Sequence, residues 1–217
     1  MAKQKAAALT DALTRLSTGE AASEVARALG LKAEHFDSMF KAPEYYQRCA
    51  YYHPEKQLEE GQYALAPHSD GSFLTLLPMT PVPGLEVMTP EKKWLKVSYV
   101  KDALIVNTGQ VLNRMSNDHF IATPHRVVNP PMKRSALTFF FYPDDDASVG
   151  PIPECMAPGE APKYDERSFY DFFVPYLDDL HARFGMGHDR KTWLDMMLAE
   201  LERSGAMQVQ EGILIDV

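Results

Sequence analysis

Pro67-His68-Ser69-Asp70-Gly71 opens the segment that decides the fold, which extends from residue 66 to residue 141. Runs rich in Phe, Leu, Val and Thr, the residues favoured in β-strands, recur in it at 72–79, 123–128 and 134–141. Proline-containing breaks that interrupt such runs lie at 81–84, 89–93 and 129–131. About seven short strands at this spacing predict a sandwich or barrel. The fold class is therefore mainly β, with flanking α-helices.

His68 and Asp70 are separated by a single residue, so on an extended chain their side chains point to the same face. His125, from the second β-like run, is a candidate third ligand from a distant strand. Two imidazoles and one carboxylate that leave open coordination positions are the ligands typical of non-haem Fe(II) oxygenases. Arg134 opens the third run, and a guanidinium near a metal is suited to holding a carboxylate through two parallel hydrogen bonds. The ordered set of His-x-Asp, a distant His and an Arg is more specific than any of its members.

The segment from about residue 45 to residue 143 resembles the isopenicillin N synthase-like family of Fe(II)/2-oxoglutarate-dependent dioxygenases. The pieces that carry the resemblance, in chain order, are Tyr51-Tyr52-His53-Pro54, Pro67-His68-Ser69-Asp70-Gly71, Leu74-Thr75-Leu76-Leu77-Pro78, Pro83-Gly84-Leu85-Glu86-Val87, Trp94, Ala103-Leu104-Ile105-Val106-Asn107-Thr108-Gly109 and His125-Arg126-Val127-Val128-Asn129-Pro130. The resemblance implies a double-stranded β-helix (jelly roll) core. It also implies that His68, Asp70 and His125 bind Fe(II), with 2-oxoglutarate as co-substrate and O2 as oxidant.

By the same resemblance, Arg134 and Tyr52 are expected to hold 2-oxoglutarate. Tyr52 also has a competing interpretation, that of a buried tyrosine paired to another group. Further residues expected to line the pocket are Thr75, Leu77, Val87, Asn107, Ala136 and Thr138.

The chain departs from the family pattern at two positions around the co-substrate site. Ala50 stands where the family often has an asparagine, and Ala136 stands where the serine of its Arg-x-Ser motif is expected. The alternative register would place Lys133 and Ser135 on these two motif positions. We prefer the register in which strand alternation sends Arg134, Ala136 and Thr138 to one face.

Most family members also carry a long segment before the helix with which this chain begins. Its absence leaves three explanations: a compact form, a truncated chain, or a fold completed by a second subunit. An exposed sheet edge and apolar patch favour association, so we expect a homodimer or a partner subunit.

Composition narrows the function classes. The 217 residues suit one domain, and a formal net charge of −8 without a dense basic tract argues against nucleic-acid binding. No apolar run is long enough to span a membrane or to act as a signal peptide. The two cysteines, Cys49 and Cys155, make no disulfide scaffold, which favours the cytoplasm.

Flanking the β core, hydrophobic residues at helical spacing predict helices on both sides. We expect a single domain over 1–217, with a helical segment at 1–44, the jelly roll at 45–143, and a loop followed by helices at 144–217. The predicted helices are 5–16, one that begins after Thr18 and stops at Gly30, 33–40, 166–184 and 191–203. The apolar residues 212–217 are expected to form either an added strand or a frayed end.

Three hypotheses for function follow. The first is a 2-oxoglutarate-dependent oxygenase that hydroxylates, desaturates or cyclises a small molecule, such as an amino acid or a natural-product intermediate. The second is an Fe(II) oxidase of the isopenicillin N synthase or aminocyclopropane-carboxylate oxidase type, which needs no 2-oxoglutarate. The third is a non-catalytic metal-binding module.

Overall fold

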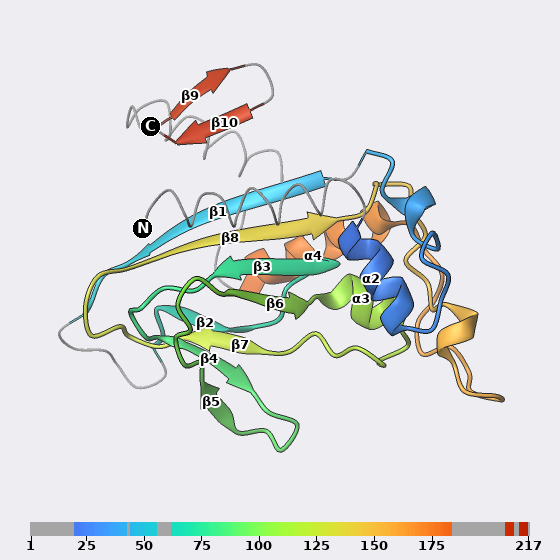
Figure 1. Ribbon diagram of the computed structural model, residues 1–217, viewed down its shortest axis with the longest axis horizontal. Helices are drawn as coiled ribbons and strands as arrows, with labels where there is room; N and C mark the ends of the chain where they lie inside the picture. Colours follow the sequence, from blue (N-terminus) through green and yellow to red (C-terminus); the bar gives the residue numbers. More distant parts are fainter. Residues whose placement is uncertain (1–19, 43, 56–61, 184–206, 211–212, 217) are drawn as a thin grey trace. The chain divides into compact units, whose positions relative to one another are not determined.

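The computed structural model describes residues 20–42, 44–55, 62–183, 207–210 and 213–216 (Figure 1). The chain divides into two compact units, residues 1–169 and 170–217. The prediction of a single domain over 1–217 stays a prediction. Among the described residues, no helix is long and apolar enough to cross a membrane.

Two four-stranded antiparallel sheets form the core of the first unit (Figure 1). One sheet has the order β1-β8-β3-β6, with bounds Glu44–Tyr52, Arg134–Tyr142, Leu74–Pro78 and Leu104–Thr108. The other has the order β2-β7-β4-β5, with bounds Leu65–His68, His125–Val127, Leu85–Met88 and Trp94–Lys96. Two such sheets are the architecture of the predicted jelly roll. The seven strands β2–β8 lie within the stretch expected to be β, and the three proline-containing breaks fall between strands.

Strands β1 and β8 form the longest strand pair of this sheet, and their register decides which side chains lie opposite each other. Strand β1 pairs with β8 along its full length, from Glu44 opposite Tyr142 to Tyr52 opposite Arg134. Strand β3 pairs with the other edge of β8, which places β8 inside the sheet and β1 at its edge. Because side chains alternate, Arg48 and Tyr52 share a face of β1, and Arg134 and Thr138 share the same face of β8.

Aromatic rings fill the core at one end of this sheet. Phe73, fully buried, contacts Phe36 and Phe40 edge-on, with ring centroids 5.2 and 5.1 Å apart. Phe40 also stacks on Phe141 at 4.5 Å. These contacts tie the segment before β1 to strand β8, and aromatic pairs of this kind add stability beyond the area they bury.

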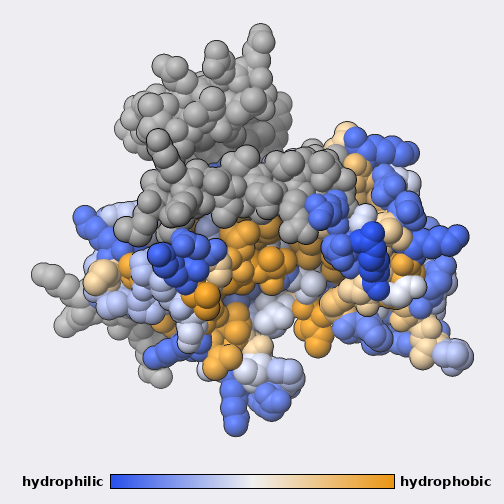
Figure 2. Space-filling model, viewed as in Figure 1, coloured by the Kyte–Doolittle hydropathy of each residue, from blue (hydrophilic) through white to orange (hydrophobic). Residues whose placement is uncertain are grey.

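The view in Figure 2 shows hydrophobic residues gathered where β3 and β6 run in Figure 1, with hydrophilic residues to the left and right of them.

The helices agree only in part with those predicted from the sequence. Helix α2 (Glu20–Ala28) packs through Ala22 and Ala26, and it ends at Gly30, whose positive φ of 75° is the left-handed conformation that glycine favours. The helix expected at 33–40 is wrong, because this stretch forms turns and only the short 3-10 helix η1 (Asp37–Met39). The helices predicted at 5–16 and 191–203 lie outside the described residues.

Helix α3 (Gln110–Met115) was not predicted, because six residues carry too little periodicity. Gly109 precedes it. A Cβ at this position would lie 2.0 Å from the carbonyl oxygen of Ser72, so only glycine fits here. After β8 come a loop that contains the 3-10 helix η2 (Pro153–Cys155) and then helix α4 (Phe169–Arg183), within the predicted 166–184. At the C-terminus, β9 (Met207–Gln210) and β10 (Ile213–Asp216) form a hairpin, which favours the strand alternative.

Candidate metal centre and co-substrate pocket

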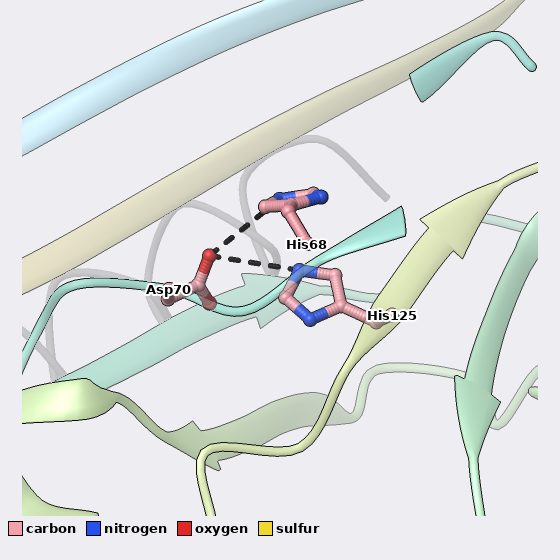
Figure 3. A group of neighbouring side chains, drawn as sticks. All are labelled: His68, Asp70 and His125. Carbon is pink, nitrogen blue, oxygen red and sulfur yellow. Dashed lines mark ion pairs between the residues drawn. The ribbon is translucent and has the colours of Figure 1, made fainter. Parts of the chain in front are cut away.

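The ends of β2 and β7 bring His68, Asp70 and His125 together (Figure 3). His68 is the last residue of β2 and pairs with His125, the first residue of β7. Asp70 lies two residues beyond the end of β2, not on a strand with His68 as the sequence suggested. Its Oδ1 is 3.8 Å from Nε2 of His68 and 3.5 Å from Nε2 of His125. One ligand atom from each residue lies within 4.8 Å of the others, a spacing at which all three could bind a common ion.

Backbone carbonyls orient both imidazoles. Nδ1 of His68 lies 2.8 Å from the carbonyl oxygen of Ala66, and Nδ1 of His125 lies 3.1 Å from that of Thr123. A carbonyl oxygen only accepts, so each Nδ1 donates its proton, and each Nε2 turns a lone pair toward Asp70. Burial lowers the pKa of His68, and the neighbouring His125 lowers it further. A lowered pKa keeps the ring neutral near pH 7, as metal binding requires.

Asn107, on β6, orients the carboxylate. Its Nδ2 donates a hydrogen bond of 2.8 Å to Oδ2 of Asp70, which leaves Oδ1 directed at the two histidines. The backbone of Asp70 is fixed as well, because the amide of Gln110 donates to its carbonyl oxygen at 2.7 Å. Asp70 is only 5% exposed, so this orientation is held inside the protein.

These donors suit a divalent transition metal. Two neutral imidazole nitrogens and one carboxylate oxygen on one side of an ion leave the opposite side open, which is the arrangement of non-haem Fe(II) sites. Each ligand also has the supporting hydrogen bond that metal-binding side chains usually possess. The three residues therefore form a candidate iron site.

A cavity of about 240 Å³ lies beside the three residues, lined by side chains from both sheets. It brings together every residue that the sequence placed at the site: His68, Asp70, His125, Arg134, Tyr52, Thr75, Leu77, Val87, Asn107, Ala136 and Thr138. The remaining walls are mainly apolar, from Leu65, Leu85, Ile105, Val106, Val127 and Phe140. Apolar walls around a few polar groups are typical of a small-molecule site.

Arg134 is the cation expected to hold a carboxylate. It is 5% exposed, and within the described structure its Nε and Nη1 are buried without hydrogen-bond partners. Its guanidinium carbon lies 5.3 Å from the ring centroid of Tyr52, directly across the strand pair. Burial lowers the pKa of Arg134, an arginine that nonetheless stays charged near pH 7. A buried guanidinium with unused donors fits the distal carboxylate of 2-oxoglutarate.

The two departures from the family pattern lie in β1 and β8. Arg134 and Ala136 both line the cavity, whereas Ser135 is exposed on the other face, as the preferred register expects. Ala136 offers no hydroxyl to a carboxylate bound at Arg134. Ala50, opposite Ala136 in the strand pair, offers no amide either.

Two polar residues of the described cavity lining, Arg48 and Thr123, were missed. Arg48, on β1, lines the cavity together with Tyr52, and alternation four residues back from Tyr52 is the signal that could have found it. Glu86, whose direction the sequence left open, is buried and forms an ion pair with Arg126, 2.7 Å between Oε2 and Nη2. That guanidinium lies over the rings of Tyr63 and Trp94, at 4.9 and 4.1 Å from the ring centroids. Neither Glu86 nor Arg126 lines the cavity.

Comparison with known proteins agrees with this geometry. Residues 43–143, which contain all three candidate ligands and Arg134, match the family model of the 2OG-Fe(II) oxygenase superfamily. Over this segment the chain belongs to the 2OG-Fe(II) oxygenase superfamily. The fold and the resemblance expected from the sequence are thereby confirmed.

The chain is also similar to proteins named as dioxygenases and oxidase homologs. The chain is 35% identical over 160 residues to 2-oxoglutarate-dependent dioxygenase 11 of Oryza sativa subsp. japonica, a match that covers 71% of this chain and 44% of that protein. It is 32% identical over 167 residues to 1-aminocyclopropane-1-carboxylate oxidase homolog 11 of Arabidopsis thaliana, covering 75% and 45%. The chain thus spans less than half of the length of these two relatives.

Solved structures of superfamily members share the fold. JOX2 in complex with 2OG, Fe and JA superposes with a TM-score of 0.65 at 29% identity, covering 75% of this chain and 48% of that one. The rice dioxygenase for auxin oxidation superposes with a TM-score of 0.64 at 24% identity, covering 82% and 58%, and supports the fold alone. The jelly roll is therefore the superfamily's double-stranded β-helix.

Proposed function

We propose that this chain is a 2-oxoglutarate-dependent Fe(II) dioxygenase that oxidises a C–H bond of a small molecule. The observation that carries the proposal is one cavity shared by three convergent ligands and a buried guanidinium that has no carboxylate partner among the described residues. His68, Asp70 and His125 would hold the iron, and Arg134 would hold the distal carboxylate of 2-oxoglutarate. Membership of the superfamily and the 2-oxoglutarate-dependent relatives support these assignments.

When bound, iron and 2-oxoglutarate supply the oxidising power, which converts O2 and 2-oxoglutarate to succinate and CO2 as the substrate is oxidised. The protein contributes position and environment. Asn107 keeps one oxygen of Asp70 directed at the histidines, and the two backbone carbonyls keep both Nε2 atoms unprotonated. The apolar walls exclude water from the reacting C–H bond and leave hydroxylation, desaturation or cyclisation open as outcomes.

A second candidate is an Fe(II) oxidase that needs no 2-oxoglutarate. It is favoured by Ala136, which removes one expected hydrogen bond to the co-substrate, and by the relatives named as 1-aminocyclopropane-1-carboxylate oxidase homologs. Loss of one such bond weakens binding by roughly 0.5–1.5 kcal/mol, which Arg134 alone can outweigh because its bonds are charge-assisted. The first function is therefore preferred.

Succinate release separates these functions. The protein, supplied with Fe(II), 2-oxoglutarate and O2, is expected to form succinate, and Asp70→Ala and Arg134→Gln are expected to stop it. Arg27→Gln, which removes an exposed arginine on α2, is the matched control and should leave the rate unchanged. Iron binding without succinate in the presence of candidate substrates would favour the oxidase, and failure to bind iron would favour a non-catalytic module.

We also propose association with a second copy or partner subunit, in a reducing cytoplasm. In the described sheet β1 lies at an edge and carries the exposed Tyr45 and Tyr51, features that favour strand pairing or docking. Cys49 and Cys155 are both free thiols, compatible with that compartment. Light scattering coupled to size exclusion tests association with a second copy, which a monomer at micromolar concentration would contradict.

A further inference from the structure

The cavity contains a second cation that the proposed chemistry does not use. Arg48 lines the cavity from β1, and its Nε is buried without a hydrogen-bond partner in the described structure. Six arginine side chains are described, and four of them pair with carboxylates: Arg27 with Glu24, Arg114 and Arg167 with Asp165, and Arg126 with Glu86. The two that have no such partner among the described residues, Arg48 and Arg134, both line this cavity.

The two arginines enter the cavity lining from different points of the strand pair. On the paired strands Arg134 is opposite Tyr52, and Arg48 is opposite Thr138, four residues farther along β8. At about 3.3 Å per residue, their backbone positions are roughly 13 Å apart along the strands. Arg134 stays against the ring of Tyr52, at 5.3 Å. Arg48 lines the same cavity as His68 and Asp70, from a point four residues before Tyr52 on β1.

The charges of the cavity lining are not balanced. Among the described residues, its ionised groups are two arginines and one carboxylate, that of Asp70, which leaves one positive charge when both histidines are neutral. A divalent metal together with the 2-oxoglutarate dianion would add no net charge. One positive charge would therefore remain next to apolar walls, a placement that is unfavourable unless a counter-ion pairs with it.

From this imbalance we infer that Arg48 binds a carboxylate of the primary substrate, which is then a small monocarboxylic acid. A monoanion neutralises the remaining charge, whereas a phosphate monoester, a dianion near pH 7, would overbalance it. The guanidinium fork matches a carboxylate in a bidentate fashion and would orient the substrate relative to the iron. The acid would share the cavity of about 240 Å³ with the co-substrate, which favours a small one.

This inference rests on the proposed function and is tested by binding rather than by turnover. The protein is loaded with Fe(II) and 2-oxoglutarate without oxygen, and calorimetry then measures its affinity for small monocarboxylic acids, each beside its neutral primary amide. Inorganic phosphate is the third probe. The variants are Arg48→Gln, Arg48→Lys, and Arg27→Gln as the control on an exposed arginine.

We expect the wild type and Arg27→Gln to prefer an acid over its amide. In Arg48→Gln the affinity for the acid falls roughly tenfold to a hundredfold, because the loss of a hydrogen bond to a charged group changes an affinity by about that factor. Arg48→Lys retains part of it, because the charge remains but the fork is lost. Affinity for 2-oxoglutarate, which reports both folding and the Arg134 site, stays within twofold in both Arg48 variants.

Three results would overturn the inference while leaving the proposed function standing. They are an equal preference for acids in wild type and Arg48→Gln, tighter binding of amides or phosphate than of any acid, and a loss of 2-oxoglutarate affinity in Arg48→Gln that assigns this arginine to the co-substrate. If the wild type binds no 2-oxoglutarate at all, the proposed function and the inference fall together.

Discussion

Replacing Asn107 by alanine should weaken metal binding without touching a ligand. Asn107 donates the hydrogen bond of 2.8 Å to Oδ2 of Asp70, a carboxylate that is 5% exposed. Without it, Asp70 is free to turn either oxygen away from the histidines, and its buried charge loses a donor. A hydrogen bond to a charged group contributes roughly 1.5–3 kcal/mol, so we expect Fe(II) affinity to fall about tenfold to a hundredfold.

The assay is calorimetry: wild type and Asn107→Ala are each titrated with Fe(II) in the absence of oxygen. Asn129→Ala is the matched control, because Nδ2 of Asn129 also donates a bond of 2.8 Å, to the carbonyl oxygen of Glu55, outside the cavity lining. The control should bind Fe(II) as the wild type does. Equal Fe(II) affinity in Asn107→Ala and wild type would refute the claim that Asn107 orients the metal carboxylate.

Three further changes test other parts of the structure. Ala136→Ser should tighten 2-oxoglutarate binding by roughly 0.5–1.5 kcal/mol, which is about twofold to tenfold in affinity. Calorimetry measures this affinity, with Ser135→Ala as the control on an exposed residue. An unchanged affinity in Ala136→Ser would contradict the placement of Ala136 next to the carboxylate. Phe73→Ala, which empties a fully buried site among aromatic rings, should lower the free energy of unfolding by about 3–5 kcal/mol in urea titrations, and a loss below 1 kcal/mol would contradict that packing. The hydroxyl of Tyr164 donates a hydrogen bond to Asp118, which holds the pKa of that carboxyl below its usual 3.8. The hydrogen bond therefore stabilises the fold above pH 3.8, and this stabilisation is lost as the pH falls through the lowered pKa of Asp118. Tyr164→Phe should therefore lower stability at pH 7 by no more than about 1 kcal/mol, because the carboxylate is partly exposed, and the difference from wild type should shrink in acid; a difference that grows in acid would reverse the assigned sign.

The sequence predicted the β core because its signals are local. Strand alternation alone placed Arg134, Ala136 and Thr138 on one face, and the structure finds all three in the lining of one cavity. The convergence of His68 and His125 is a tertiary fact, made by the pairing of β2 with β7. The sequence offered it only as an ordered set of ligand types, to which the family resemblance added support.

The misses have physical causes of the same kind. Helix α3 is too short to show a period, and the turns at 33–36 resemble a helix because their hydrophobic residues are helically spaced. Arg48 resembled any charged residue of an edge strand until the register of β1 and β8 placed it in the cavity. Its lack of a carboxylate partner among the described residues depends on the whole fold, and no local pattern encodes it.

The most direct test of the central claim is the stoichiometry of Fe(II) binding in the absence of oxygen. The wild type is predicted to bind one equivalent, and Asp70→Ala and His125→Ala are predicted to bind none at the same concentrations while keeping the circular dichroism of the wild type. Equal binding by wild type and both variants would show that these side chains do not hold the metal, and the oxygenase assignment would fall with them.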